Sequence, residues 1–350
     1  MQMFIDGKVA DAADSATINV INPATAKLID TVPAATKEDI SRTISAARKA
    51  QPAWAVVPVH EKVDILLKFL DLVGENHESL AQLLCAETGK PIVEARAEIS
   101  NITIAFRAFC ERAKHLYGQT IPAGMEAGQE HHVLITRREP LGVIVAVIPF
   151  NFPCDLFDQK VAPALLAGNA VVVKPSTDNP LTLCKLTALL GAAGIPAGVC
   201  QIVTGRGSTV GNWLCSDPGV DAITLTGSAE VGIETARNAS AHLIHTALEL
   251  GGNDAFILLE DGDVDLAVDE LVWGRMYNTG QVCCASKRFL IQRSRIKEFT
   301  DKAVTKIASL KQGDPTDEDS KLGCLISENA AIQAADQTTL TVEQGAHIIS

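Results

Sequence analysis

The sequence has 350 residues, and 47% of them are hydrophobic, which is enough to bury the core of two domains or of one large α/β unit. Charged residues make up 21% of the chain, and the formal net charge is −12 with no block of Lys and Arg. Phosphate backbones and anionic lipids need clustered positive charge, so the composition argues against nucleic acid and membrane surfaces as partners.

The cysteine usage favours a reducing compartment. Nine cysteines are present, an odd number, at irregular spacing apart from the adjacent pair Cys283 and Cys284. This pattern fits free thiols better than a disulfide framework. The opening residues lack the regions of a signal peptide, and no apolar run is long enough to cross a bilayer, so we expect a cytoplasmic location. No C-x-x-C motif occurs, and His242 and His245 lack surrounding ligands, so we expect no metal site.

The first third of the chain predicts a turn-rich, extended opening followed by long helices. Apolar residues that recur every three and four positions predict helices over 37–54, 59–87 and 91–118. Gly89 and Pro91 separate the last two. The helical pattern stops between 120 and 139, where HHVLITRRE predicts a strand that projects from the body.

From residue 141, buried strands alternate with helices. Apolar runs of strand length are LGVIVAVIPF, AVVVKPS, CQIVTG and AITLTG, and helical patterns follow them over 155–169, 180–194, 207–217 and 228–240. This alternation predicts right-handed crossovers and a doubly wound parallel sheet, with ligands at the carboxyl ends of the strands. A second αβ stretch begins after LIHTALELGGNDAFILLE, with a helix over 263–280, a strand over 288–292 and a helix over 295–311.

Two turns at the ends of these strands suit a dinucleotide. In TGSAEVG, residues 226–232, Gly227 lets the backbone approach a pyrophosphate, and the following helix offers free N–H groups. The spacing is not G-x-G-x-x-G, so the turn alone is equally typical of a structural loop. In VVVKPS, Lys174 ends a buried strand, where it binds a ribose or phosphate or is simply solvated.

Three further stretches carry reactive side chains. In PFNFP, Asn151 sits in a turn stiffened by prolines, where its amide suits an oxyanion or ordinary turn hydrogen bonds. In LELGGN, Glu249 follows an apolar strand and suits a general base or an exposed strand end. In GQVCCASKR, residues 280–288, a thiol acts as a nucleophile only if it is accessible and polarised, and a cysteine is otherwise a small apolar group.

Together these five stretches resemble the aldehyde dehydrogenase superfamily. PFNFP, VVVKPS, LTGS, LELGGN and GQVC occur in that family's order and with fitting gaps, and the resemblance covers essentially the whole chain. It implies an α/β fold in which a doubly wound parallel sheet forms the cofactor domain and a second α/β domain is catalytic. The implied boundaries are 1–119 with 140–251 for dinucleotide binding, 120–139 for a projecting oligomerisation segment, and 252–350 for the N-terminal part of the catalytic domain.

The resemblance also implies roles for single residues. The family pattern G-Q-x-C places the nucleophile at Cys283 and leaves Cys284 as a packing neighbour, because adjacent side chains point in different directions. Asn151 is then the oxyanion donor, Glu249 the general base, and Lys160 a supporting residue. The residues implied to contact NAD or NADP are Phe150, Lys174, Ser176, Thr177, Gly207, Gly227, Ser228 and Gly232.

The implied activity is the oxidation of an aldehyde to a carboxylate. Cys283 adds to the aldehyde, hydride passes to NAD(P), and water deprotonated by Glu249 hydrolyses the resulting thioester. The implied partners are a small aldehyde and further copies of the chain, as a homodimer or homotetramer when complete.

The sequence departs from the family in its length. Family members run past residue 350 and carry an E-x-F-G-P motif that this sequence lacks. We therefore expect a C-terminally shortened chain with an incomplete catalytic domain and weak turnover of its own.

The sequence also departs at residues that select the cofactor and the substrate. Many NAD-preferring members have Glu where Thr177 stands, and a neutral side chain removes repulsion against a 2′-phosphate. The stretches around PFNFP and TGRGST resemble most the branch that acts on lactaldehyde, glycolaldehyde and glyceraldehyde 3-phosphate. Arginines of the succinate-semialdehyde members are replaced by Gln159 and Tyr277, and that of the phosphate-specific members by Val282. We expect a small neutral or hydroxylated aldehyde.

Two alternatives stay open. The missing E-x-F-G-P motif favours a dinucleotide-binding relative that is weak or inactive, whereas intact Cys283, Glu249 and Asn151 favour an enzyme. A CoA-acylating relative is the other alternative, and Glu249 argues against it because a water-activating base would then be superfluous.

Overall fold

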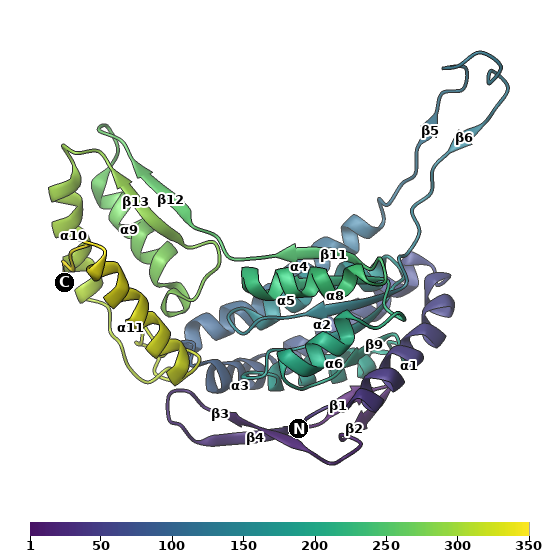
Figure 1. The fold of residues 1–350 in the computed structure, drawn as a ribbon, viewed down its shortest axis with the longest axis horizontal. Coiled ribbons are helices and arrows are strands. Elements are labelled where there is room, and N and C mark those ends of the chain that lie inside the picture. Colours follow the sequence, from purple (N-terminus) through teal and green to yellow (C-terminus); the bar gives the residue numbers. More distant parts are fainter. Residues whose placement is uncertain (350) are drawn as a thin grey trace.

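A seven-stranded sheet forms the centre of the larger part of the molecule in the computed structural model, which describes residues 1–349 (Figure 1). The strand order is β11-β10-β7-β8-β9-β1-β2. Five neighbouring strands are parallel, namely β7 (Val143–Val147), β8 (Ala170–Lys174), β9 (Cys200–Ile202), β10 (Ala222–Thr226) and β11 (His245–Glu249). The predicted doubly wound parallel sheet is confirmed.

The N-terminal residues extend this sheet in a way that the sequence did not predict. β1 (Met3–Ile5) pairs antiparallel with β9, where Phe4 lies opposite Ile202, and β2 (Lys8–Ala10) forms the edge. A separate antiparallel hairpin of β3 (Thr17–Ile21) and β4 (Leu28–Pro33) follows. The turn-rich opening is therefore a pair of hairpins, and the sheet is mixed at one edge.

The central strands are buried on both faces, which explains their continuous apolar runs. Ile144 and Ala146 of β7 join one core cluster, whereas Val143 and Val145 join another, as the alternation of a strand requires. On one face, α5 (Pro153–Leu166) and α6 (Leu181–Ala193) cover the sheet. On the other face lie α1 (Lys37–Ala55), α7 (Asn212–Cys215) and α8 (Ala229–Ser240).

An outer layer of helices packs on α5 and α6. It consists of α2 (Val59–Glu75), α3 (His77–Thr88) and α4 (Ile92–Ala113). The prediction of one continuous helix over 59–87 is wrong, because the chain breaks at Asn76. Gly74 weakens the last turn of α2, and the Asn76 side chain donates a 2.9 Å hydrogen bond to the Leu72 carbonyl, which ends that helix.

A short hairpin of β5 (Thr120–Ile121) and β6 (Leu134–Ile135) projects far from this body (Figure 1). The predicted helix over 207–217 is also different from expectation. Residues Gly207–Gly211 form a π-type turn, and only the single turn of α7 follows it.

The remaining residues form a smaller α/β unit (Figure 1). Parallel strands β12 (Asp254–Leu258) and β13 (Ser286–Ile291) pack against α9 (Val264–Met276) and α10 (Ile296–Ala308). After them comes α11 (Glu328–Glu343), which has none of its residues buried and which the sequence analysis did not predict. Among residues 1–349, no helix combines the length and the apolar character needed to cross a membrane.

Candidate active site

Cys283 and Cys284 lie in the loop between α9 and β13. The predicted helix over 263–280 ends early, at Met276, because Asn278 and Thr279 adopt left-handed backbone angles with φ of 49° and 54°. This turn brings the loop of Cys283 back against the large sheet. Both cysteines are exposed, so the expectation that Cys284 is only a packing neighbour is wrong.

Two cavities meet at this loop. The smaller has a volume of about 520 Å³ and the larger about 730 Å³. Their shared wall is formed by Asn151, Thr226, Leu250, Val282 and Cys283. Cys284 lines only the larger cavity, and Cys283 lines both. A group on Cys283 can therefore react with one molecule while facing a second.

The smaller cavity lies where the sheet topology predicts a ligand. It opens at the carboxyl ends of β7, β8 and β10, and the chain order reverses between β7 and β10. Of the residues implied to contact the dinucleotide, those that line it are Phe150, Lys174, Ser176, Thr177, Gly207, Gly227 and Ser228. Gly232 is absent from this lining. It packs under Leu250, whose Cδ2 would lie 2.7 Å from an added Cβ.

The chemistry of this lining fits an anionic dinucleotide. Ser228 caps α8, its Oγ accepting from the Val231 N–H, so the positive end of that helix faces the cavity. Lys174 is buried, and burial lowers the pKa of its ammonium to about 8. Among the described residues, Thr226 Oγ1 is buried without a hydrogen-bond partner on the shared wall.

The larger cavity contains Glu249 and Lys160. Glu249 ends β11 and is exposed to this cavity. Lys160 projects from α5, is buried, and donates a 3.1 Å hydrogen bond to Thr224 Oγ1. Burial lowers the pKa of Lys160 to about 8, and the negative charge of Glu249 opposes that shift. The two side chains therefore interact electrostatically across the cavity.

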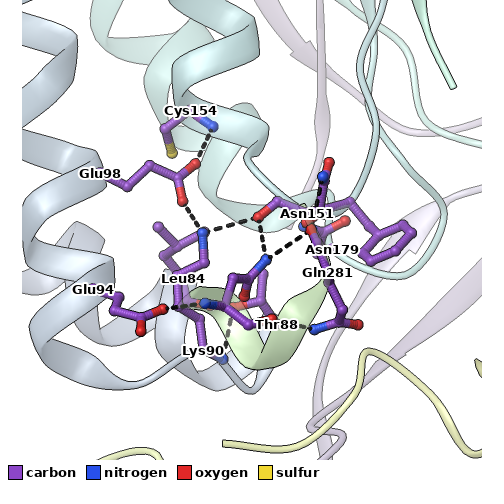
Figure 2. A network of polar contacts seen from close by, with 11 residues as sticks. Leu84, Thr88, Lys90, Glu94, Glu98, Asn151, Cys154, Asn179 and Gln281 are labelled. Carbon is purple, nitrogen blue, oxygen red and sulfur yellow. Dashed lines mark hydrogen bonds and ion pairs between the residues drawn. The ribbon is translucent and has the colours of Figure 1, made fainter. Parts of the chain in front are cut away.

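Figure 2 shows that Asn151 is hydrogen-bonded through its side-chain amide and through its backbone carbonyl. Its amide Nδ2 donates to the Gln281 carbonyl at 2.9 Å, and its own carbonyl accepts from Lys90 Nζ at 2.9 Å. Asn278 Nδ2 donates to the same carbonyl at 2.9 Å. Lys90 forms a fully buried ion pair with Glu98.

Sequence reasoning missed this network. The one available signal was a lysine between Gly89 and Pro91 at a helix junction, and lysines are almost always solvated.

Within residues 1–349, His, Cys, Asp and Glu side chains form no group of three placed to hold a metal ion.

Comparison with known proteins decides the family. The aldehyde dehydrogenase family model matches residues 10–350. The chain belongs to the aldehyde dehydrogenase family. A glutarate-semialdehyde dehydrogenase of Pseudomonas putida is 36% identical over 349 residues, which cover 100% of this chain and 72% of that protein. A D-glyceraldehyde dehydrogenase (NADP(+)) of Picrophilus torridus is 35% identical over 94% of this chain and 66% of its own length.

Solved structures agree with the sequence relatives. PnpE, solved in complex with nicotinamide adenine dinucleotide, superposes with a TM-score of 0.96 at 33% identity. The match covers 100% of this chain and 71% of that chain. The predicted fold class is confirmed, and the protein is an enzyme of the NAD(P)-dependent aldehyde dehydrogenase class.

Proposed function

We propose that this aldehyde dehydrogenase oxidises its aldehyde through a covalent intermediate on Cys283. The observation that carries the proposal is the position of Cys283 on the wall between the two cavities, with Asn151 beside it. The smaller cavity suits the dinucleotide, whose nicotinamide supplies the hydride acceptor when bound. The larger cavity then receives the aldehyde.

The side chains suit successive steps. The Cys283 thiolate adds to the aldehyde carbon, and the second N–H of the Asn151 amide, free of Gln281, suits the oxyanion that develops. Once the adduct has lost its hydride, a thioester remains on Cys283. Glu249, exposed in the same cavity, takes a proton from water, and the resulting hydroxide releases the carboxylic acid and restores the thiolate.

We propose NADP as a cofactor at least as good as NAD. Thr177 lines the smaller cavity, and its hydroxyl donates to the Gly205 carbonyl at 3.3 Å. A neutral residue at this position offers a 2′-phosphate no repulsion. The relative from Picrophilus torridus uses NADP(+) by its name, which supports the proposal.

We propose a small neutral, hydroxylated aldehyde as substrate. Of the described residues that line the larger cavity, Lys160 is the one cation, and it faces Glu249. Asp155 adds a second carboxyl group to the wall, and burial followed by the charge of Glu98 raises its pKa to about 7. Carboxyl groups hydrogen-bond hydroxyls but repel the carboxylate of a semialdehyde.

The test is rapid mixing of the protein and NADP with glyceraldehyde or with glutarate semialdehyde. The wild type should oxidise glyceraldehyde with the higher kcat/KM. Glu249→Gln should keep a burst of NADPH, because hydride loss precedes hydrolysis, and should lose steady turnover by about a hundredfold. Loss of the burst in this variant would assign Glu249 a role before hydride transfer. A preference for the semialdehyde would contradict the proposed substrate class.

A further inference from the structure

A buried ion pair outside both cavities touches the loop that carries Asn151. Lys90 follows α3 and Glu98 lies on α4, and both side chains have no solvent exposure (Figure 2). The two residues line neither cavity. We propose that the Lys90–Glu98 pair is a positioning device that fixes Asn151 relative to Cys283. The inference rests on the proposed function of those two residues.

The pair holds three successive points of the Asn151 loop. Lys90 Nζ donates to the Asn151 carbonyl at 2.9 Å and lies 4.0 Å above the ring of Phe152. Glu98 accepts the backbone N–H of Cys154 at 2.8 Å, at the start of α5. These contacts fix a carbonyl, a ring and an N–H within four residues, so the loop has little freedom to rotate.

The same loop is tied to the loop of the nucleophile. Asn278 Nδ2 is the second donor to the Asn151 carbonyl, and the Asn278 N–H donates to Glu94 Oε2 at 2.8 Å. The Asn151 amide donates to the carbonyl of Gln281, two residues before Cys283. Asn151 is therefore a second link between the outer helices and the Cys283 loop, beside the direct contact of Asn278 with Glu94. The backbone position of Asn151 sets the direction of its amide.

Burying the Lys90–Glu98 ion pair costs desolvation energy that an apolar pair in the same space would not cost. Around the pair, Glu94, Asp155 and Asp158 have raised pKa values because burial disfavours their charged forms, and Glu98 contributes repulsion to each. An apolar pair of similar volume would avoid these costs and is often neutral or stabilising in protein interiors. It would, however, leave the Asn151 carbonyl with one donor and the Cys154 N–H with none. The presence of a charged pair at this place is explained by the positioning of the Asn151 loop rather than by a gain in stability.

The test is a double-mutant cycle on the NADPH burst with glyceraldehyde. The proteins are the wild type, Lys90→Met, Asn151→Ala and the double variant. Because a misplacement of about 1 Å costs on the order of a hundredfold, Lys90→Met should slow the burst by about 10- to 100-fold. The KM for aldehyde and the Kd for NADP should stay within about threefold. In the Asn151→Ala background, Lys90→Met should slow the burst by no more than about twofold, because the group it positions is gone.

Three further variants separate positioning from loss of stability. Lys90→Arg keeps the charge and the donors and should recover part of the rate. Asn278→Gly removes the second donor while glycine tolerates the left-handed backbone, so it should slow the burst in the same non-additive manner, even if Lys90→Met fails to fold. Asp39→Asn is the control, because this buried carboxylate caps α1 far from the site and should lower the midpoint of unfolding with an unchanged burst.

A readout without turnover separates this inference from the proposed function. Iodoacetamide alkylation of Cys283, followed by tandem mass spectrometry to distinguish it from Cys284, reports the loop directly. Lys90→Met and Asn151→Ala should change the rate of Cys283 alkylation alike and without adding. A wild type with no burst would refute the proposed function alone. Full additivity in the burst or in alkylation, or a Lys90→Met variant that behaves as wild type, would overturn the positioning role.

Discussion

Replacement of Lys160 by Met tests the electrostatics of the larger cavity. Burial lowers the pKa of Lys160 from 10.5 to about 8, which corresponds to a native-state penalty of about 3 kcal/mol for the charged form. Met retains most of the apolar stem, and the lost hydrogen bond to Thr224 Oγ1 costs about 1 kcal/mol. At pH 7 the free energy of unfolding of Lys160→Met should therefore be about 2 kcal/mol larger than that of the wild type.

The pH dependence gives this prediction its sign. Below about pH 8, Lys160 is protonated in the folded and the unfolded chain, so the penalty is complete. Between about pH 8 and 10.5 the unfolded wild-type chain binds more protons than the folded one, and wild-type stability gains on that of the variant. The advantage of Lys160→Met should therefore shrink from pH 7 to pH 10.

Denaturant titrations of the wild type and the variant at both pH values measure this difference. Lys49→Met, at an exposed lysine of α1, is the matched control and should show almost no difference from the wild type at either pH. Aldehyde turnover of Lys160→Met should fall, because Glu249 loses the opposite charge across the cavity. A variant less stable than the wild type at pH 7, or a difference that does not change with pH, would refute the reasoning.

Four other substitutions probe the site. Cys283→Ser should abolish aldehyde oxidation in a steady-state assay and Cys284→Ser should retain most of it; the reverse result would exchange their roles. Thr177→Glu should weaken NADP relative to NAD by at least about tenfold in a fluorescence titration, because a carboxylate meets the 2′-phosphate, and equal losses for both cofactors would contradict that contact. Gly232→Ala should change the free energy of unfolding by less than about 1 kcal/mol in a denaturant titration, because strain against Leu250 is offset by the higher helix propensity of Ala in α8; a loss of several kcal/mol would show that Leu250 cannot move aside.

The order of strands and helices was predictable where each element carries its own signal. The apolar runs of β7, β8 and β10 are long, and the helices after them have clear periodicity, so the parallel sheet followed from the sequence. The pairing of Met3–Ile5 with Cys200–Ile202 was not predictable. It joins segments almost two hundred residues apart, and the pattern of a three-residue strand is too short to predict which strand it pairs with.

The residues of the candidate site also fall into those that the sequence predicts and those that it does not. Asn151, Lys174 and Glu249 come at the ends of recognisable strands, and strand ends meet at one edge of a parallel sheet. Lys90 lies between α3 and α4, and Glu98 lies on α4, so only tertiary packing of the outer layer brings them under the Asn151 loop. Likewise, the exposure of Cys284 depends on the left-handed turn at Asn278 and Thr279, which the helical pattern of that segment concealed.

The reversal of strand order explains why two cavities share one wall. β8 lies on one side of β7 and β10 on the other, so the turns after β7 and β10 diverge and leave a crevice between them. Asn151 comes from the first turn and Thr226 from the end of β10, and the Cys283 loop of the smaller α/β unit closes the crevice between them. Because each side of this wall faces a separate cavity, the thioester proposed on Cys283 would face Glu249 while the dinucleotide occupies the other side. The positions of Asn151 and Cys283 are thus set by different units of the fold. Two hydrogen bonds join the two loops, one from the Asn151 amide to the Gln281 carbonyl and one from the Asn278 amide to the Asn151 carbonyl.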